Sequence, residues 1–166
     1  DLRCEAYGET DSSVSAMGLA RALCADPKVK IILRDLQNQL FTIGAELATL
    51  PENYSKMKEH YRTTSSETVK ALERTIDELE SKVDLPPSFI IPGASPGSAA
   101  LDLARSNLRS AERRIIDLDS EGILVNKEIL SYINRLSDLL FMLARYEDRA
   151  LATEVITGQK IEDLDD

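Results

Sequence analysis

The sequence predicts an all-α fold: a five-helix bundle of four long antiparallel helices and a shorter N-terminal helix, forming one domain over residues 1–166. Two observations support this prediction. Apolar residues recur at spacings of three and four along several segments, which is the pattern of a helix with one buried face. No segment alternates polar and apolar residues over a length typical of a strand. The chain is long enough to bury one sizeable core.

The N-terminal part contains two of the predicted helices. The first carries a short apolar stripe over residues 14–24, and we expect Asp11 or Ser12 to cap it. The second carries a stripe over residues 32–47. Asp26 precedes Pro27 at its start, and proline is favoured in a first helical turn. Pro51 ends this helix, because the residue before a proline avoids the helical conformation.

Three further apolar stripes run over residues 69–83, 101–118 and 129–143. The segment 84–96 (DLPPSFIIPGASP) is a connection rich in Pro, Gly and Ser, and Gly122 marks the break between the last two helices. Residues 151–166 form an acidic tail, and we expect its end, IEDLDD, to be frayed.

The net charge of −9 argues against nucleic-acid and membrane-surface roles, because an acidic surface repels phosphate groups. No apolar run reaches the length of a membrane span, and the start DLR is not a signal peptide. The chain does not begin with Met, so we expect residues ahead of Asp1. Cys4 and Cys24 lack disulfide or metal-ligand spacing, and we interpret them as reduced, buried thiols. These features favour the cytoplasm, or the mitochondrial matrix in a eukaryote.

The segment ARSNLRSAERR (104–114) carries the densest functional signal. At about 100° per residue, Arg105, Arg109 and Glu112 share one face beside the apolar stripe, and Arg113 extends it. Arginine donates bidentate hydrogen bonds and stays charged, so this face suits a polyphosphate or a carboxylate. The alternative is a solvated face laced by Arg–Glu pairs.

Two further features favour a ligand site. Asn134, Asp138, Phe141 and Arg145 share a second face of the last long helix, where Asn134 can read an adenine or ribose edge. The alternative there is an exposed polar face with an incidental aromatic. In the connection PPSFIIPG, prolines hold Phe89 in extended backbone, where it either meets an apolar ligand or covers the core.

The sequence offers no protein nucleophile or metal site of a known pattern. His60 is the only histidine and has no second ligand at helical spacing, so we interpret it as solvated. Neither a Ser/His/Asp or Cys/His arrangement nor a phosphate-binding glycine loop is present. Asp77 and Glu78 belong to a solvated face.

The segments YGETD, LQNQLFTIGAELAT, FIIPG, ARSNLRSAERR and YINRLSDLLFMLARYED follow one another along the chain. In their order and approximate spacing the chain resembles the propanediol-utilisation (PduO) type of ATP:corrinoid adenosyltransferase. The resemblance extends from about Tyr7 to Asp148, and AERR and NRLSDLLF are its specific parts. It implies a ferritin-like five-helix bundle that forms a homotrimer with active sites at the subunit interfaces.

The resemblance also implies a reaction: the 5′-deoxyadenosyl group of ATP moves to the cobalt of cob(I)alamin, which releases triphosphate and forms adenosylcobalamin. ATP binds with Mg²⁺, and cob(II)alamin is held base-off and reduced before Co(I) attacks the ribose. The cobalt is then the nucleophile, which explains why the protein lacks one. A reductase and an adenosylcobalamin-dependent enzyme are the implied protein partners.

The residues that the resemblance places at ATP lie on the last two long helices: Arg109 (the leading phosphate clamp), Ser110, Ala111, Glu112, Arg113 and Asn134. It places Phe89 at the lower face of the corrin, where it keeps the nucleotide-loop base off the cobalt. It pairs Asp11 with Arg105 across the subunit boundary, and these two complete the catalytic set with Arg109.

The chain departs from the family pattern at Ser12, where a glutamate is usual, and at Ser110, where an arginine is usual. The glycine-rich, basic ATP-binding segment expected ahead of YG..D is also missing from this sequence. Two alternative functions therefore stay open: a corrinoid-binding or chaperone-like module with weakened catalysis, and an oligomeric helical scaffold.

Overall fold

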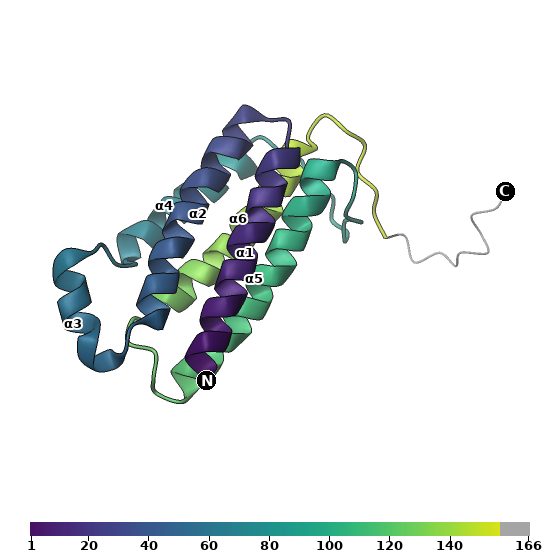
Figure 1. Cartoon of the computed structure of the whole chain (residues 1–166). Helices are drawn as coiled ribbons and strands as arrows, with labels where there is room; N and C mark the ends of the chain where they lie inside the picture. Colours follow the sequence, from purple (N-terminus) through teal and green to yellow (C-terminus); the bar gives the residue numbers. More distant parts are fainter. Residues whose placement is uncertain (157–166) are drawn as a thin grey trace.

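The computed structural model describes residues 1–156, which form a bundle of six α-helices (Figure 1). The helices are α1 (Leu2–Leu23), α2 (Pro27–Ala48), α3 (Pro51–His60), α4 (Ser66–Glu80), α5 (Pro96–Ser120) and α6 (Glu128–Glu147). The all-α prediction is confirmed, with α3 as an additional short helix. None of the helices in the described part combines the length and apolarity needed to span a bilayer.

Local sequence signals explain most helix boundaries. The Asp26 carboxylate accepts hydrogen bonds from the backbone N–H groups of Lys28 and Val29, and Pro27 begins α2 as predicted. Helices α4 and α5 begin with reciprocal capping boxes at Ser65 and Ser95. Gly122 has a φ of 68° and turns the chain after α5, where the sequence predicted a break.

The prediction that the first helix is short is wrong. Helix α1 has 22 residues and its N-cap is Asp1, so Asp11 and Ser12 lie inside it and are exposed. The buried face of its first half uses small residues, including Thr10 and Ser13, which an apolar stripe does not reveal. Their hydroxyls donate to the carbonyls of Ala6 and Glu9, so burial leaves neither hydroxyl unpaired. The short helix of the bundle is α3.

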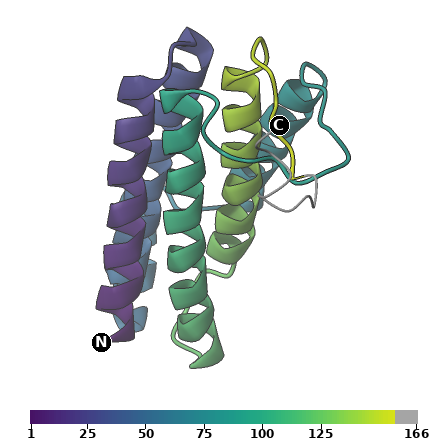
Figure 2. The ribbon, with the colours of Figure 1, turned by 90° about the vertical axis from the view of Figure 1, so that its right-hand side faces the viewer.

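The expectation of four long antiparallel helices needs one correction, at the neighbouring pair α4 and α6. The pairs α1–α2, α1–α5 and α5–α6 run antiparallel, whereas α4 runs parallel to α6 (Figures 1 and 2). Oε1 of Glu73, in the middle of α4, lies 3.6 Å from Nε of Arg135, in the middle of α6. The excursion through α3 returns the chain to the end of the bundle at which α2 finishes, so α4 starts beside the start of α6.

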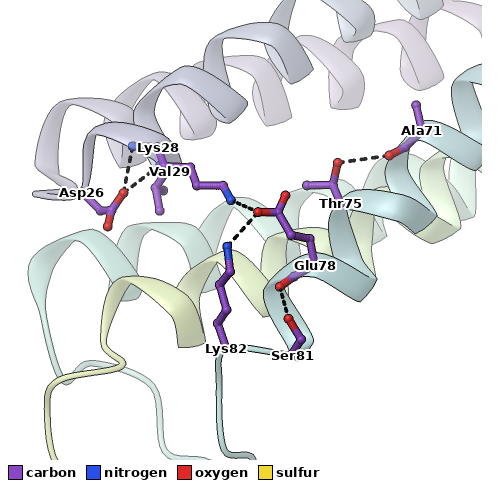
Figure 3. A network of polar contacts seen from close by, with 8 residues as sticks. All are labelled: Asp26, Lys28, Val29, Ala71, Thr75, Glu78, Ser81 and Lys82. Atoms are coloured by element: carbon purple, nitrogen blue, oxygen red, sulfur yellow. Dashed lines mark hydrogen bonds and ion pairs between the residues drawn. The ribbon is translucent and has the colours of Figure 1, made fainter.

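Helix α4 is attached to α2 by a surface ion network at the other end of the bundle (Figure 3). Glu78 accepts hydrogen bonds from Lys28 of α2 and from Lys82, whose Nζ lies 2.7 Å away. These two lysines lower the pKa of Glu78 to about 2. The prediction that Glu78 belongs to a solvated face is confirmed, and its partners cross between helices.

Candidate active site

A cleft of about 570 Å³ opens where α4, α5 and α6 meet the connection between α4 and α5. Its wall combines apolar side chains with five charged ones; the lining residues are Ile76, Glu80, Leu85, Ser88, Phe89, Ile90, Pro92, Asp102, Arg105, Asp138, Phe141, Met142 and Arg145. Phe89, Arg105, Asp138, Phe141 and Arg145, singled out on separate segments of the sequence, therefore share one cavity.

The side of the cleft formed by α5 and α6 is built around the ring of Phe141. The guanidinium carbon of Arg145 lies 5.2 Å from the ring centroid, and that of Arg105 lies 5.9 Å away. Arg145 is only 7% exposed and bonds to Asp102 at 2.5 Å. Burial raises the pKa of Asp102, and the charge of Arg145 opposes this effect. Cation–π contacts and the ion pair thus fix the aromatic ring in place.

The mouth of the cleft carries Phe89, whose side chain is 83% exposed. Its backbone is held by a C-terminal segment through an antiparallel bridge between Ile90 and Val155. Ile156 donates its N–H to the carbonyl of Phe89 (3.0 Å), and Ile91 donates to the carbonyl of Glu154 (2.9 Å). Part of the segment predicted to be a tail therefore positions the loop; IEDLDD lies outside the described residues.

Beside the cleft, α5 presents the predicted arginine face. Arg109 and Arg113 are exposed, and Arg113 donates to the Ser110 hydroxyl at 2.8 Å. Asn134 of α6 donates to Glu112 of α5 at 3.1 Å, which joins the two predicted nucleotide-contacting helices. The side chain of Ala111 is fully buried beneath this face and packs in the core.

Asp11 lies elsewhere on the chain. It lines a separate cavity of about 260 Å³ between α1 and α2, together with Tyr7 and Phe41. Within residues 1–156 of this single chain, Asp11 and Arg105 form no ion pair. The predicted contact between them across a subunit boundary stays a prediction.

The two thiols differ from each other. Cys24 is buried as expected. Its burial and, as a smaller effect, the nearby charge of Glu147 raise the pKa of the thiol to about 12. Cys4 is exposed, contrary to the expectation of a buried residue. It precedes the stripe at residues 14–24 and lies on the outer face of the unexpected first half of α1.

Sequence reasoning missed several residues of the cleft, chiefly Asp102 and Met142. Asp102 carries a usable signal, because it precedes Arg105 by three positions and so shares its helix face. Met142 carries none, because it reads as one more apolar residue of α6.

Comparisons with known proteins identify the fold. The family model described as Cobalamin adenosyltransferase matches residues 1–147. The corrinoid adenosyltransferase PduO of Salmonella typhimurium is 42% identical over 146 residues, which cover 88% of this chain and 42% of that protein. A corrinoid adenosyltransferase of Citrobacter freundii is 35% identical, with 89% and 82% covered. This chain thus spans about two fifths of the PduO relatives' length but most of the shorter one.

Among solved structures, a variant PduO-type ATP:corrinoid adenosyltransferase from Lactobacillus reuteri, complexed with cobalamin and ATP, superposes with a TM-score of 0.83. The sequences are 31% identical, and the match covers 95% of this chain and 87% of that one. A second variant from the same organism, complexed with ATP, gives 0.81 at 29% identity, covering 94% and 87% of the two chains. The chain described here belongs to the cobalamin adenosyltransferase family.

Proposed function

We propose that this protein transfers the 5′-deoxyadenosyl group of ATP to the cobalt of cob(I)alamin, releasing triphosphate and forming adenosylcobalamin. One observation carries the proposal: a cleft lined by two phenylalanines adjoins an arginine face that suits a polyphosphate. Arg105 belongs to both, because it lines the cleft and lies over the ring of Phe141. The Lactobacillus reuteri relative, complexed with both cobalamin and ATP, supports this pairing of sites.

We assign the corrinoid to the cleft and place Phe89 at the lower face of the corrin ring. An exposed phenyl ring at the cleft mouth offers no ligand atom to cobalt, so it displaces the nucleotide-loop base without replacing it. A cobalt without a lower ligand is easier to reduce to Co(I), the nucleophile of the reaction. The protein therefore contributes mainly by binding and orienting its two substrates.

ATP is assigned to the arginine face of α5. Arg109 is the leading phosphate ligand, because it is exposed and forms no ion pair within residues 1–156. Ser110, Glu112 and Arg113 follow it on the same helix, and Asn134 of α6 donates to Glu112. Mg²⁺ enters with the phosphates, since this ion is usually held by phosphate oxygens and one or two carboxylates, and Glu112 is the carboxylate of this face. Arginine and Mg²⁺ together stabilise the charge on the departing triphosphate.

We further propose a homotrimer with its active sites between subunits. Asp11 and Arg105 line different cavities of one chain, so a pair between them requires a second copy. Tyr7 and Phe41 beside Asp11 are 47% and 61% exposed, as expected of a face that another subunit covers. The bacterial relatives favour a cytoplasmic protein.

The test is anaerobic absorbance spectroscopy of the full-length protein with chemically reduced cob(I)alamin and Mg-ATP. Loss of the cob(I)alamin band with growth of the adenosylcobalamin spectrum is expected, and it should depend on ATP. A spectrum that ATP leaves unchanged would refute the transferase.

The departures at Ser12 and Ser110 favour one alternative, a corrinoid-binding module with weakened catalysis. That alternative predicts base-off cob(II)alamin binding without ATP-dependent turnover. Failure to bind either ligand would instead favour a helical scaffold.

A further inference from the structure

A second cavity lies directly behind the corrinoid cleft. It has a volume of about 270 Å³ and shares Leu85, Ile90 and Arg145 with the cleft. Its other walls come from residues 82–84 after α4, from Asp148 and Arg149 just after α6, and from the C-terminal segment, including Thr153. The shared residues make it a side chamber of the cleft, and its volume is ample for one side group of a ligand held in the cleft.

Two polar atoms of the chamber residues have no hydrogen-bond partner within residues 1–156. They are Nε of Arg145, a donor, and Oδ1 of Asp148, an acceptor. The side chain of Arg145 is 93% buried, because only 7% of it is exposed. An unpaired buried polar group is destabilising, so native proteins rarely leave one without a partner.

The charges of the chamber disfavour an anionic occupant. Its three cations are each paired with a carboxylate: Lys82 with Glu78, Arg145 with Asp102, and Arg149 with Asp26. Asp84 and Asp148 form no ion pair in the described part of the chain, which leaves an excess of negative charge. A phosphate or carboxylate would meet this excess, whereas a neutral group with N–H donors would not.

A primary carboxamide meets both demands. Its oxygen accepts a hydrogen bond, as Nε of Arg145 requires, and its NH₂ group donates two, as Oδ1 of Asp148 requires. Corrinoids carry carboxamide side chains around the rim of the macrocycle. We propose that the chamber binds one of these carboxamides, with Asp148 as a specificity-determining residue. The inference rests on the proposed corrinoid function of the cleft.

The test changes the ligand first. Mild hydrolysis of cobalamin converts single peripheral propionamides to propionates, and isothermal titration measures the Kd of each monocarboxylate in the cob(II) state with the full-length protein. One monocarboxylate should bind at least about tenfold more weakly than cob(II)alamin, because it loses an N–H donor and is repelled by Asp148. Equal affinities for all of them would overturn the proposal, and this arm does not depend on any variant folding.

A variant then assigns the effect to one residue. Asp148→Asn supplies an N–H donor to a carboxylate, so it should bring the affected monocarboxylate to within about threefold of cob(II)alamin. Asp84→Asn makes the same change of charge in the same chamber without supplying a donor at position 148, so it should reduce the discrimination much less than Asp148→Asn. Discrimination that survives in Asp148→Asn, or that vanishes equally in Asp84→Asn, would contradict the assignment to Asp148.

Two further outcomes separate this inference from others. Cob(II)inamide lacks the nucleotide tail but keeps the remaining rim amides, so it should bind within about threefold of cob(II)alamin. Weak cob(II)inamide binding with no effect of amide hydrolysis would assign the chamber to the tail phosphodiester and overturn the proposal. Adenosylation of cob(II)alamin under reducing conditions without discrimination among monocarboxylates would refute only the chamber, whereas no cob(II)alamin binding would refute the corrinoid function as well.

Discussion

Two regions at opposite ends of the bundle are built in opposite ways. Where α2 ends and α6 begins, Glu46 is 4% exposed and accepts hydrogen bonds from Tyr54, Thr64 and Asn126 at 2.6–2.7 Å. At the cleft, the exposed Phe89 is held by two backbone hydrogen bonds to the C-terminal segment. The first region is a buried framework and the second is an exposed cover. Changes in the framework should lower stability, and changes in the cover should lower ligand affinity.

The largest effect is expected at Glu46. Glu46→Ala leaves the N–H and hydroxyl of Thr64 and the amide of Asn126 without their buried acceptor. The free energy of unfolding should fall by about 3 kcal/mol or more. Urea denaturation followed by circular dichroism measures this change. Glu59→Ala on exposed α3 is the control and should be almost neutral; a similarly small loss at Glu46 would contradict the framework.

Arg109→Ala should leave the fold intact and reduce turnover. An exposed arginine that contacts the leaving triphosphate through charge-assisted hydrogen bonds contributes about 2–3 kcal/mol, which corresponds to a fall in kcat/KM of roughly 30- to 150-fold. Steady-state kinetics with varied ATP measures it. Arg74→Ala removes another exposed arginine, paired with Glu67 on α4, and should retain activity. Equal activity of both variants would refute the assignment of Arg109.

Phe89→Ala tests the cover directly. Loss of the exposed ring should raise the Kd of base-off cob(II)alamin by about tenfold, since about 1.4 kcal/mol of contact is lost. ATP affinity should stay within about twofold, because the arginine face does not include Phe89. Absorbance titration of the base-on to base-off change gives the first value and calorimetry gives the second. Tyr61→Ala, which removes an exposed aromatic ring at the end of α3, is the control and should leave the base-off state unchanged.

Ile156→Pro tests the hydrogen bond that positions the Phe89 loop and leaves the residues of the loop unchanged. Proline has no N–H, so the hydrogen bond to the carbonyl of Phe89 is lost, while Ile156→Ala keeps it. The loss of about 1 kcal/mol should weaken cob(II)alamin binding about fivefold, with the melting temperature almost unchanged. Equal affinities of the proline and alanine variants would mean that this hydrogen bond does not position Phe89.

The same contrast explains what the sequence could predict. Framework helices such as α6 place Ile129, Ile133 and Leu140 at regular spacing, so periodicity located them. The first half of α1 was missed because its buried face uses Thr10 and Ser13, whose burial depends on backbone acceptors that an apolar pattern does not encode.

Within the candidate site, too, the helical residues could be predicted and the contacts between distant segments could not. The helical faces of Arg105 and Phe141 followed from spacing, and the structure brings them to one cleft. The bridge between Ile90 and Val155 joins residues 65 positions apart and has no local signal. The parallel arrangement of α4 and α6 is likewise decided by the excursion through α3, which the sequence analysis did not include.

The smallest effect is expected at Asp26, which caps the start of α2 at the opposite end of this helix from Glu46. Burial acts to raise its pKa, but hydrogen bonds from Arg149, Val29 and Lys28 outweigh this and hold the pKa below its ordinary value. A lowered folded pKa means that the stabilisation is present above the unfolded value of about 3.9 and is lost as the pH falls through the folded one. Asp26→Ala should therefore lower the free energy of unfolding by about 1 kcal/mol at neutral pH and by progressively less in acid. Denaturation of both proteins at pH 7 and pH 3 measures the difference. Asp35→Ala, whose exposed carboxylate lies 3.6 Å from Arg34, should cost almost nothing at either pH; a loss at Asp26 that does not shrink in acid would assign the effect to packing rather than to charge.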